Sequence, residues 1–196
     1  MASTAPARSP SLNPENWLRA AETRLAEQGI DSVRIEVLAR DLGVSKGSFY
    51  WHFRDRSELL DKLLASWEDT QLDWLGADDA SAPAARWAKF IARTADPGRM
   101  RMEVALLSWA RLDERVAARV AAVEKKKARV IADVLFDIGF AQSAADSWSE
   151  VVQLICLGWL DRATRDRQFE LAGRGLGEVL SDFILAASAR SGAAHT

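Results

Sequence analysis

Residues 43–53 read Gly-Val-Ser-Lys-Gly-Ser-Phe-Tyr-Trp-His-Phe, and the fold of the amino-terminal region follows from this stretch. Apolar residues at helical spacing precede it and stop at Gly43, where a tight turn requires a positive φ. Ser45 then offers a side-chain oxygen that caps a new helix. We therefore predict two short helices, over residues 34–42 and 46–53, joined by a tight turn.

Three residues explain how these two helices pack together. Ala39 is small enough for the helices to cross at that point, and Val44 and Phe49 are placed to hold the second helix against the first. Two short helices joined in this way form a helix-turn-helix.

The outward residues of the second helix suit contact with DNA. Lys46 is able to meet a phosphate, and the small residues Gly47 and Ser48 let the start of the helix approach base edges closely. The residues that follow offer a hydroxyl, an aromatic edge and an imidazole: Tyr50, Trp51 and His52. We interpret this face as a surface that binds double-stranded DNA.

The rest of the chain also shows helical spacing and lacks the alternating pattern typical of strands. Further helices are predicted over residues 14–28, 55–75, 83–95, 99–112, 114–138, 144–165 and 174–188. The predicted fold class is all-α, with about nine helices. A basic run, Lys125-Lys126-Lys127, lies within one long helix, where such a run usually covers a solvated face, and we expect no function for it.

The charge balance argues weakly against a nucleic-acid partner. The 196 residues include 26 Lys and Arg against 28 Asp and Glu, a net charge of −2, and residues 1–66 contain nine of each sign. Because nucleic-acid-binding proteins often carry a basic excess, attraction to DNA must come from the placement of the charges.

The sequence indicates no catalytic, cofactor or metal site. It has no Gly-rich phosphate loop, serine elbow or zinc-protease motif, and we expect no enzyme activity and no cofactor. Cys156 is the only cysteine and lies in an apolar run, so it is predicted to be a packed core residue. His52 and His195 are far apart and have no Cys or carboxylate at ligand spacing, so no metal is expected.

Neither a membrane span nor a secretion signal is expected. Residues 151–160 form the longest strongly apolar run, which is shorter than a membrane span. Residues 1–14 lack the apolar stretch of a secretion signal. We therefore expect a cytoplasmic protein with no membrane partner.

The last two predicted helices carry more apolar residues than one amphipathic face requires. We expect them to pack on a second copy of the chain as well as on their own core, which makes the protein a homodimer. A larger monomer core that covers both helices is the alternative. The predicted interface residues are Val151, Leu154, Ile155, Leu176, Val179, Leu180, Phe183 and Ile184.

Residues 17–67 closely resemble the amino-terminal DNA-binding domain of the TetR family of bacterial transcriptional regulators. The family's first helix has two apolar residues, any residue and an Ala pair, here Trp17-Leu18-Arg19-Ala20-Ala21, and ends in a glycine, here Gly29. The family order continues with Leu38-Ala39, the stretch 43–53, and a helix start that here reads Asp55-Arg56-Ser57-Glu58-Leu59-Leu60.

The resemblance implies roles for individual residues. By resemblance, the phosphate or sugar contacts are Lys46, Tyr50 and His52. The positions that read bases or line the groove are Gly47, Ser48 and Trp51. Arg56 resembles a cation that anchors the DNA backbone. The predicted DNA-binding residues are Arg34, Ser45, Lys46, Gly47, Ser48, Tyr50, Trp51, His52 and Arg56.

Three residues depart from the family pattern. Arg34 replaces the usual Thr or Ser at the start of the second helix, so a cap is lost and a charge able to reach phosphate or guanine is gained. Arg24 lies where the family prefers an apolar residue, and Trp51 replaces a commoner His or Tyr.

The carboxy-terminal helices are rich in aromatic residues, and by resemblance they enclose an effector. Candidate pocket residues are Trp67, Trp87, Phe90, Met102, Leu106 and Trp109, with ordinary core packing as the alternative for each. A hydrophobic or aromatic small molecule is the expected effector.

These observations divide the chain into a flexible arm over residues 1–13, a helix-turn-helix domain over 14–60, an effector-binding and dimerisation domain over 61–190 and a flexible tail over 191–196. The predicted function is sequence-specific DNA binding: a dimeric repressor of a palindromic operator, released by its ligand. Two alternatives remain, a DNA-binding regulator without a small-molecule inducer and a helical ligand-binding protein that does not act on DNA.

Overall fold

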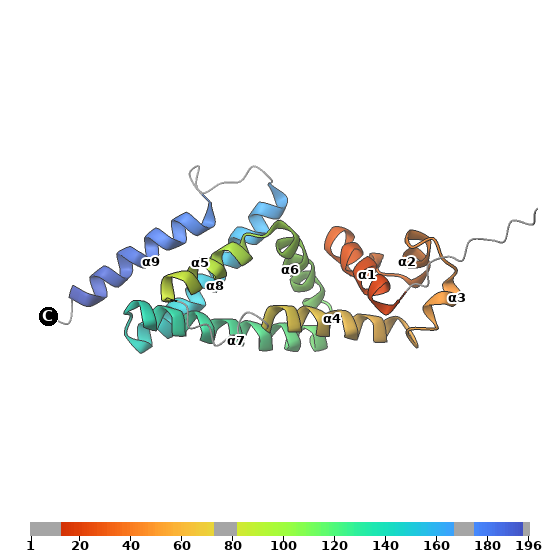
Figure 1. Ribbon diagram of the computed structural model, residues 1–196, viewed down its shortest axis with the longest axis horizontal. Helices are drawn as coiled ribbons and strands as arrows, with labels where there is room; N and C mark the ends of the chain where they lie inside the picture. The colour runs from red at the N-terminus through yellow and green to blue at the C-terminus, as the bar shows by residue number, and fades with distance from the viewer. Residues whose placement is uncertain (1–12, 73–81, 167–174, 194–196) are drawn as a thin grey trace, which may run out of the picture. The chain divides into compact units, whose positions relative to one another are not determined.

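The computed structural model describes residues 13–72, 82–166 and 175–193. Within these ranges the chain forms nine α-helices and one short 3₁₀-helix, with no strand (Figure 1). The predicted all-α class is confirmed. The chain divides into two compact units after Trp67, whereas the sequence suggested a boundary after residue 60.

The first unit contains four helices, a 3₁₀-helix and the connections between them. These are α1 (Pro14–Gln28), η1 (Ile30–Ser32), α2 (Ile35–Asp41), α3 (Lys46–Phe49) and the greater part of α4 (Arg56–Leu72). Fully buried apolar side chains form its core: Trp17, Leu25, Val33, Leu38, Phe49, Leu59 and Leu63.

Helix α1 has the predicted bounds because both of its ends carry local signals. The side chains of Asn13 and Asn16 each accept a hydrogen bond from the other residue's backbone amide, and Pro14 occupies the first helical position. Gly29 ends the helix with φ 78° and ψ 177°, a backbone region that is essentially restricted to glycine.

Helix α3 is shorter than predicted, ending at Phe49 instead of residue 53. The amides of Tyr50 and His52 donate to carbonyls three residues earlier, those of Gly47 and Phe49, so the chain tightens into turns. The Phe53 amide still donates to the Phe49 carbonyl at 3.0 Å, and the rings of these two residues stack with centroids 5.2 Å apart. The predicted cap by Ser45 is also wrong, because its side chain makes no capping hydrogen bond.

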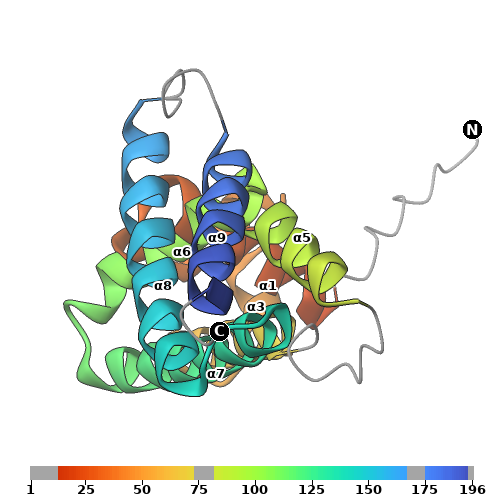
Figure 2. The same ribbon diagram turned by 90° about the vertical axis from the view of Figure 1, so that its left-hand side faces the viewer.

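The second unit contains the end of α4 and five further helices. These are α5 (Pro83–Thr94), α6 (Pro97–Ala110), α7 (Glu114–Ile138), α8 (Gln142–Arg165) and α9 (Leu176–Ala193). Helix α7 has the predicted bounds, since Asp113 caps its start and Gly139, at φ 113°, ends it. Figure 2 shows α9 beside α8, and the rings of Trp148 and Phe183 join the two helices at 4.9 Å.

Other helix ends differ from the prediction. Helix α6 begins earlier, at Pro97, because the Asp96 carboxylate accepts a hydrogen bond from the Arg99 amide at 2.8 Å. Helix α9 continues to Ala193, past the predicted end at residue 188 and into the predicted tail. Residues 1–12, 73–75 and 194–196, which carry the predicted arm, helix end and last tail residues, lie outside the described residues.

Among the helices in the described ranges, none has both the length and the hydropathy that a membrane span requires.

Candidate functional site

The turn between α2 and α3 has the predicted geometry. Gly43 adopts φ 68°, and the Val44 amide donates to the Ala39 carbonyl at 2.9 Å. Phe49 is fully buried, with its ring edge-on to Trp17 of α1 at 5.2 Å. Because α3 is fixed through Phe49, its remaining residues face away from the core of this unit.

The outward residues of α3 and the following turn form an exposed face, here called the reading face. Ser45, Lys46 and Gly47 are exposed, and Ser48 and His52 are half-buried. Tyr50 is 53% exposed and Trp51 is 87% exposed. An indole this exposed contributes almost no packing to the chain itself, so Trp51 is available to a partner.

Lys46 on the reading face already has an anionic partner, Glu36 of α2. The hydrogen bond from the Lys46 amine lowers the pKa of the Glu36 carboxyl and raises the pKa of Lys46. Both groups are therefore charged at neutral pH, and Lys46 is held between α2 and α3.

Arg56 has an internal role that the sequence did not indicate. Its guanidinium donates from Nε to the Val33 carbonyl at 2.5 Å and from Nη2 to the Ile30 carbonyl at 2.9 Å. These bonds tie the start of α4 to η1 and to Val33, which follows it. The sequence predicted that Arg56 contacts a DNA phosphate. In the structure its Nε and Nη2 groups instead donate to backbone carbonyls of the same unit.

Two other arginines of this unit depart from the family pattern in different ways. Arg34 is exposed at the N-cap of α2 and makes no capping bond, as predicted from the lost Thr or Ser. Arg24 forms a bidentate pair with Asp41, at 2.6 and 2.7 Å, which lowers the pKa of the Asp41 carboxyl. Arg24, which stands where the family prefers an apolar residue, therefore links α1 to the end of α2.

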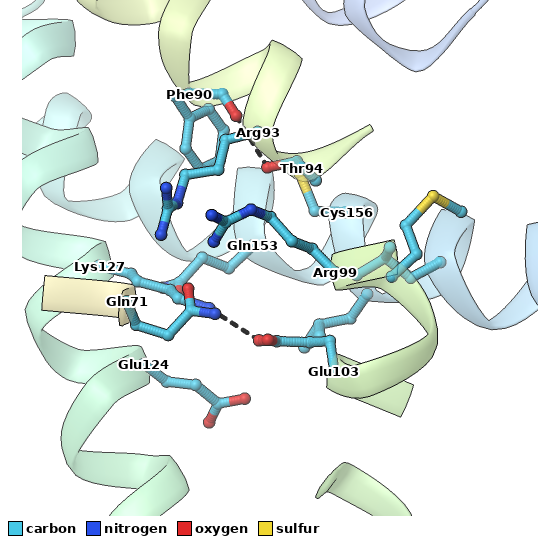
Figure 3. Close-up of a pocket in the computed structure, with 13 residues that line it drawn as sticks. Gln71, Phe90, Arg93, Thr94, Arg99, Glu103, Glu124, Lys127, Gln153 and Cys156 are labelled. Atoms are coloured by element: carbon cyan, nitrogen blue, oxygen red, sulfur yellow. Dashed lines mark hydrogen bonds and ion pairs between the residues drawn. The ribbon is translucent and has the colours of Figure 1, made fainter. Parts of the chain in front are cut away.

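The second unit contains a partly open cavity of about 70 Å³ between the end of α4 and helices α5, α6, α7 and α8 (Figure 3). Of the six predicted pocket residues, only Phe90 lines it. Trp87 packs in the core and donates from its indole to Ser181 at 3.1 Å, and Leu106 and Trp109 are also buried. Met102 is half-buried, and Trp67 belongs to the first unit.

The cavity wall is more polar than the sequence suggested. Its charged residues are Arg93, Arg99, Glu103, Glu124 and Lys127. Lys127 is only 14% exposed and pairs with Glu103 at 2.7 Å, so the interpretation of this lysine as part of a solvated face is wrong. Sequence reasoning missed these residues because a charged helix face has the same pattern whether it meets water or another helix.

Two further groups define the surroundings of the cavity. Burial, followed by the Glu103 charge, raises the pKa of Glu124, and burial raises the pKa of Cys156 to about 12. Cys156 is therefore a buried neutral thiol, as predicted. Glu124 and Leu157 also line a larger, more open hollow of about 420 Å³ between α6, α7 and α8.

The predicted dimer residues divide into two groups. Leu176, Leu180 and Ile184 are buried in the chain's own core, and Val151 and Val179 are half-buried. Leu154, Ile155 and Phe183 are exposed, at 68%, 37% and 39%. Among the described side chains of the predicted interface, these three thus remain exposed, fewer than the sequence suggested.

Known families and curated proteins match this chain in its first unit. Residues 18–63 match the family described as bacterial regulatory proteins, tetR family. The tetracycline repressor protein class A from transposon 1721 of Escherichia coli is 44% identical over 52 residues, which is 26% of this chain and 24% of that protein. The HTH-type transcriptional regulator AcrR of Shigella flexneri is 37% identical over 54 residues, 28% of this chain and 24% of that protein. The chain thus spans about a quarter of the length of these curated relatives.

Solved structures resemble the chain over most of its length. A putative transcriptional regulator from Saccharomonospora viridis, in complex with choline, has a TM-score of 0.73 at 17% identity, covering 87% of this chain and 94% of that one. A TetR transcription regulator from Haloarcula marismortui has a TM-score of 0.66 at 17% identity, covering 92% of this chain and 96% of that one. At these identities the likeness concerns the fold, a helix-turn-helix domain followed by a helical domain. Residues 18–63 thus match the tetR family of bacterial regulatory proteins, and the remainder of the chain is similar to such regulators in fold.

Proposed function

We propose that this chain is a transcriptional repressor that binds a two-fold symmetric operator as a homodimer and is released by a small ligand. The observation that carries the proposal is the reading face, where Lys46, Tyr50 and Trp51 are exposed while Phe49 locks α3 to the core. A short helix held this rigidly is able to enter a major groove without reordering.

Different residues of the reading face would contact the phosphates and the bases. Lys46, His52 and the exposed Arg34 supply donors for phosphates, which position the protein. Gly47 and Ser48 have small side chains, so the start of α3 is able to approach the bases closely. The indole of Trp51 would contact the groove through its edge or its face. Sequence preference would then come mainly from Ser48 and Trp51.

The proposed dimer forms through α8 and α9, where Leu154, Ile155 and Phe183 are exposed. Two copies related by a two-fold axis present two reading faces, and these reach successive major grooves when they lie roughly 34–36 Å apart. The remaining predicted interface residues serve the core that supports this surface.

Ligand release is proposed to act through α4. This helix begins beside the helix-turn-helix and ends in the second unit, where Gln71 lines the cavity and the Thr70 carbonyl accepts a hydrogen bond from Arg93. A ligand that fits one arrangement of this helix end better shifts the protein toward it. Going from 1:99 to 99:1 requires a difference in affinity of about 5.5 kcal/mol between the two states.

The test is fluorescence anisotropy with labelled DNA from upstream of the protein's own gene. The triple variant Lys46→Ala, Tyr50→Ala, Trp51→Ala is expected to lose binding. The control variant Lys125→Ala, Lys126→Ala removes two exposed cations from α7 and is expected to bind normally. Unchanged binding by the triple variant would refute the assignment of the reading face.

The small cavity favours a second candidate, a DNA-binding regulator without a small-molecule inducer. Pockets for drug-sized ligands are about 300–1,000 Å³, far above the 70 Å³ of this cavity, whereas the hollow of about 420 Å³ between α6, α7 and α8 falls within that range. Thermal-shift screening of the purified protein against metabolites separates the two candidates, because the second predicts no stabilising compound.

A further inference from the structure

The open hollow between α6, α7 and α8 has a volume that suits an organic ligand. Its volume of about 420 Å³ lies within the range of about 300–1,000 Å³ that pockets for drug-sized ligands occupy. Three alanines line it, Ala110, Ala117 and Ala121, and side chains this small leave space between the helices that larger ones would fill.

The part of the lining that is withdrawn from water is almost entirely apolar. Its larger side chains are buried or half-buried: Val104, Leu107, Val120, Glu124 and Leu157. Among the described lining residues that are not exposed, Glu124 is the only ionisable one. An apolar body bound here removes the aliphatic side chains from water, and Glu124 decides the charge of the ligand that accompanies it.

The Glu124 carboxylate lacks a cation of its own within the described part of the chain. Lys127, the nearest cation on α7, pairs with Glu103 at 2.7 Å, and the dashed bond in Figure 3 ends at Glu103 while none reaches Glu124. Burial raises the pKa of Glu124, and the Glu103 charge adds to this effect while the Lys127 charge opposes it. A carboxylate withdrawn from water without a counterion is stabilised when a cation binds beside it.

The other charges near the hollow do not reverse this preference. Glu150 of α8 also raises the pKa of Glu124, so it adds to the negative side. Asp161 is exposed and pairs with Arg165 at 2.6 Å. Arg111 lines the hollow on its exposed side, where water and salt screen its charge. We propose that this hollow binds an organic monocation, with its aromatic or aliphatic body against the apolar lining and its charge beside Glu124.

The proposal also gives the ligand a route to α4, and in this respect it rests on the proposed function. Arg119 of α7 is adjacent to Val120 in the hollow wall. Its guanidinium donates to the Glu68 carboxylate of α4 from Nε at 2.6 Å and from Nη2 at 2.8 Å. A ligand that displaces this stretch of α7 therefore displaces the partner of Glu68 and changes how the end of α4 is held.

Calorimetry and thermal shift with the full chain test the cation site directly. Benzyltrimethylammonium is compared with its neutral carbon analogue neopentylbenzene, and tetraphenylphosphonium with the anion of the same shape, tetraphenylborate. Tetramethylammonium supplies the charge without the apolar body. At least one aromatic cation is expected to bind more tightly than its counterpart and more tightly than tetramethylammonium, and to raise Tm. No binding by either aromatic cation, or equal binding by both cations and their counterparts, overturns the proposal.

A first pair of variants tests the role of the Glu124 charge. Glu124→Gln is expected to weaken binding of the aromatic cation about fivefold and to leave the affinity for neopentylbenzene unchanged. Glu114→Gln removes the same charge from an exposed position of the same helix and is expected to bind like the unmodified chain. Equal cation affinities of the two variants contradict the role of Glu124.

A second pair of variants assigns the binding to the hollow. Ala121→Phe places a ring in the hollow from an exposed position, so it is expected to weaken cation binding on the order of tenfold or more without disturbing the core. Ala122→Phe adds the same ring at the next exposed residue of α7, which does not line the hollow, and is expected to retain the affinity. Retained affinity in Ala121→Phe overturns the location.

DNA-binding measurements keep this proposal separate from the proposed function. If the unmodified chain binds operator DNA and neither aromatic cation binds, the assignment of the hollow alone is wrong. If a cation binds in a way that depends on Glu124 and no DNA is bound, the proposed function is wrong and the assignment of the hollow stands.

Discussion

Lys46 of α3 and Glu36 of α2 form an ion pair that joins the two helices of the helix-turn-helix on their exposed side. The cation best placed to meet a DNA phosphate is therefore already shared with a carboxylate. In the proposed complex DNA has to compete with Glu36 for Lys46, and the Glu36 charge repels phosphate. We therefore expect this pair to lower DNA affinity while it holds Lys46 in place.

Glu36→Gln is expected to increase operator affinity by up to about fivefold, the scale of one exposed charge pair. Anisotropy titrations at two salt concentrations measure the gain. Glu27→Gln, an exposed residue of α1, is the matched control because it removes the same charge from the same unit. Equal gains in both variants contradict a specific role for the Glu36 and Lys46 pair.

Gly47→Ala tests the close approach of α3 to DNA. A Cβ at this position meets only Ser45 Oγ, at 3.7 Å, so the chain has room for it, and alanine favours the helix. We therefore expect an unchanged or raised Tm and a loss of operator affinity of about tenfold or more. Gly158→Ala, at an open position in α8, is the control and is expected to bind normally. Normal binding by Gly47→Ala shows that α3 does not need a glycine there.

Asp41→Asn is expected to lower Tm at neutral pH, because it removes the carboxylate that receives Arg24. Arg24 holds the pKa of Asp41 below its ordinary value of 3.8, so the pair contributes stability above that pH and loses it as the pH falls through the lower, folded-state pKa. The Tm difference between the two proteins should therefore shrink as the pH is lowered below about 4. A difference that stays constant from pH 7 to pH 3 contradicts this role for the pair.

Arg56→Ala is expected to destabilise the protein by about 1–3 kcal/mol in the absence of DNA, since two partly buried carbonyl groups lose a charged donor. Urea denaturation measures the change. Arg54→Ala, at a largely exposed neighbouring arginine, is the control and is expected to have little effect. An unchanged stability of Arg56→Ala favours the original assignment of this residue to DNA contact alone.

Leu154→Glu is expected to convert the proposed dimer to a folded monomer, because it places a charge at the most exposed of the three apolar residues on α8 and α9. Light scattering gives the mass, and circular dichroism reports whether the helices remain. Leu112→Glu changes an equally exposed leucine outside these helices and is expected to leave the mass unchanged. A dimeric Leu154→Glu variant refutes this interface.

The reading face could be predicted because its pattern is local. Gly43 adopts the positive φ that the tight turn requires, and Phe49 is buried as its place in the pattern predicted. The length of α3 could not be predicted in the same way. It ends early because the amides of Tyr50 and His52 donate to carbonyls three residues earlier, a local tightening that hydrophobic spacing does not specify.

The candidate effector site was predicted much less well. Aromatic residues were chosen for its lining, yet Trp87 and Trp109 are packed core residues and the wall contains Arg93, Arg99 and Lys127. A tryptophan that packs a core and one that lines a cavity occupy the same helical positions. What distinguishes them is the distance to a neighbouring helix that lies tens of residues away in the sequence.

Local chemistry was enough to establish the all-α class, the helix-turn-helix and the bounds of α1 and α7, because capping residues and positive-φ glycines act within a few positions of themselves. Which side chains are buried was decided only by the tertiary structure. Leu180 lies in the core while Leu154 lies on the surface, and Lys127 turns inward while its neighbours stay exposed. Burial depends on which helix faces meet, and that is a property of contacts between distant segments of the chain.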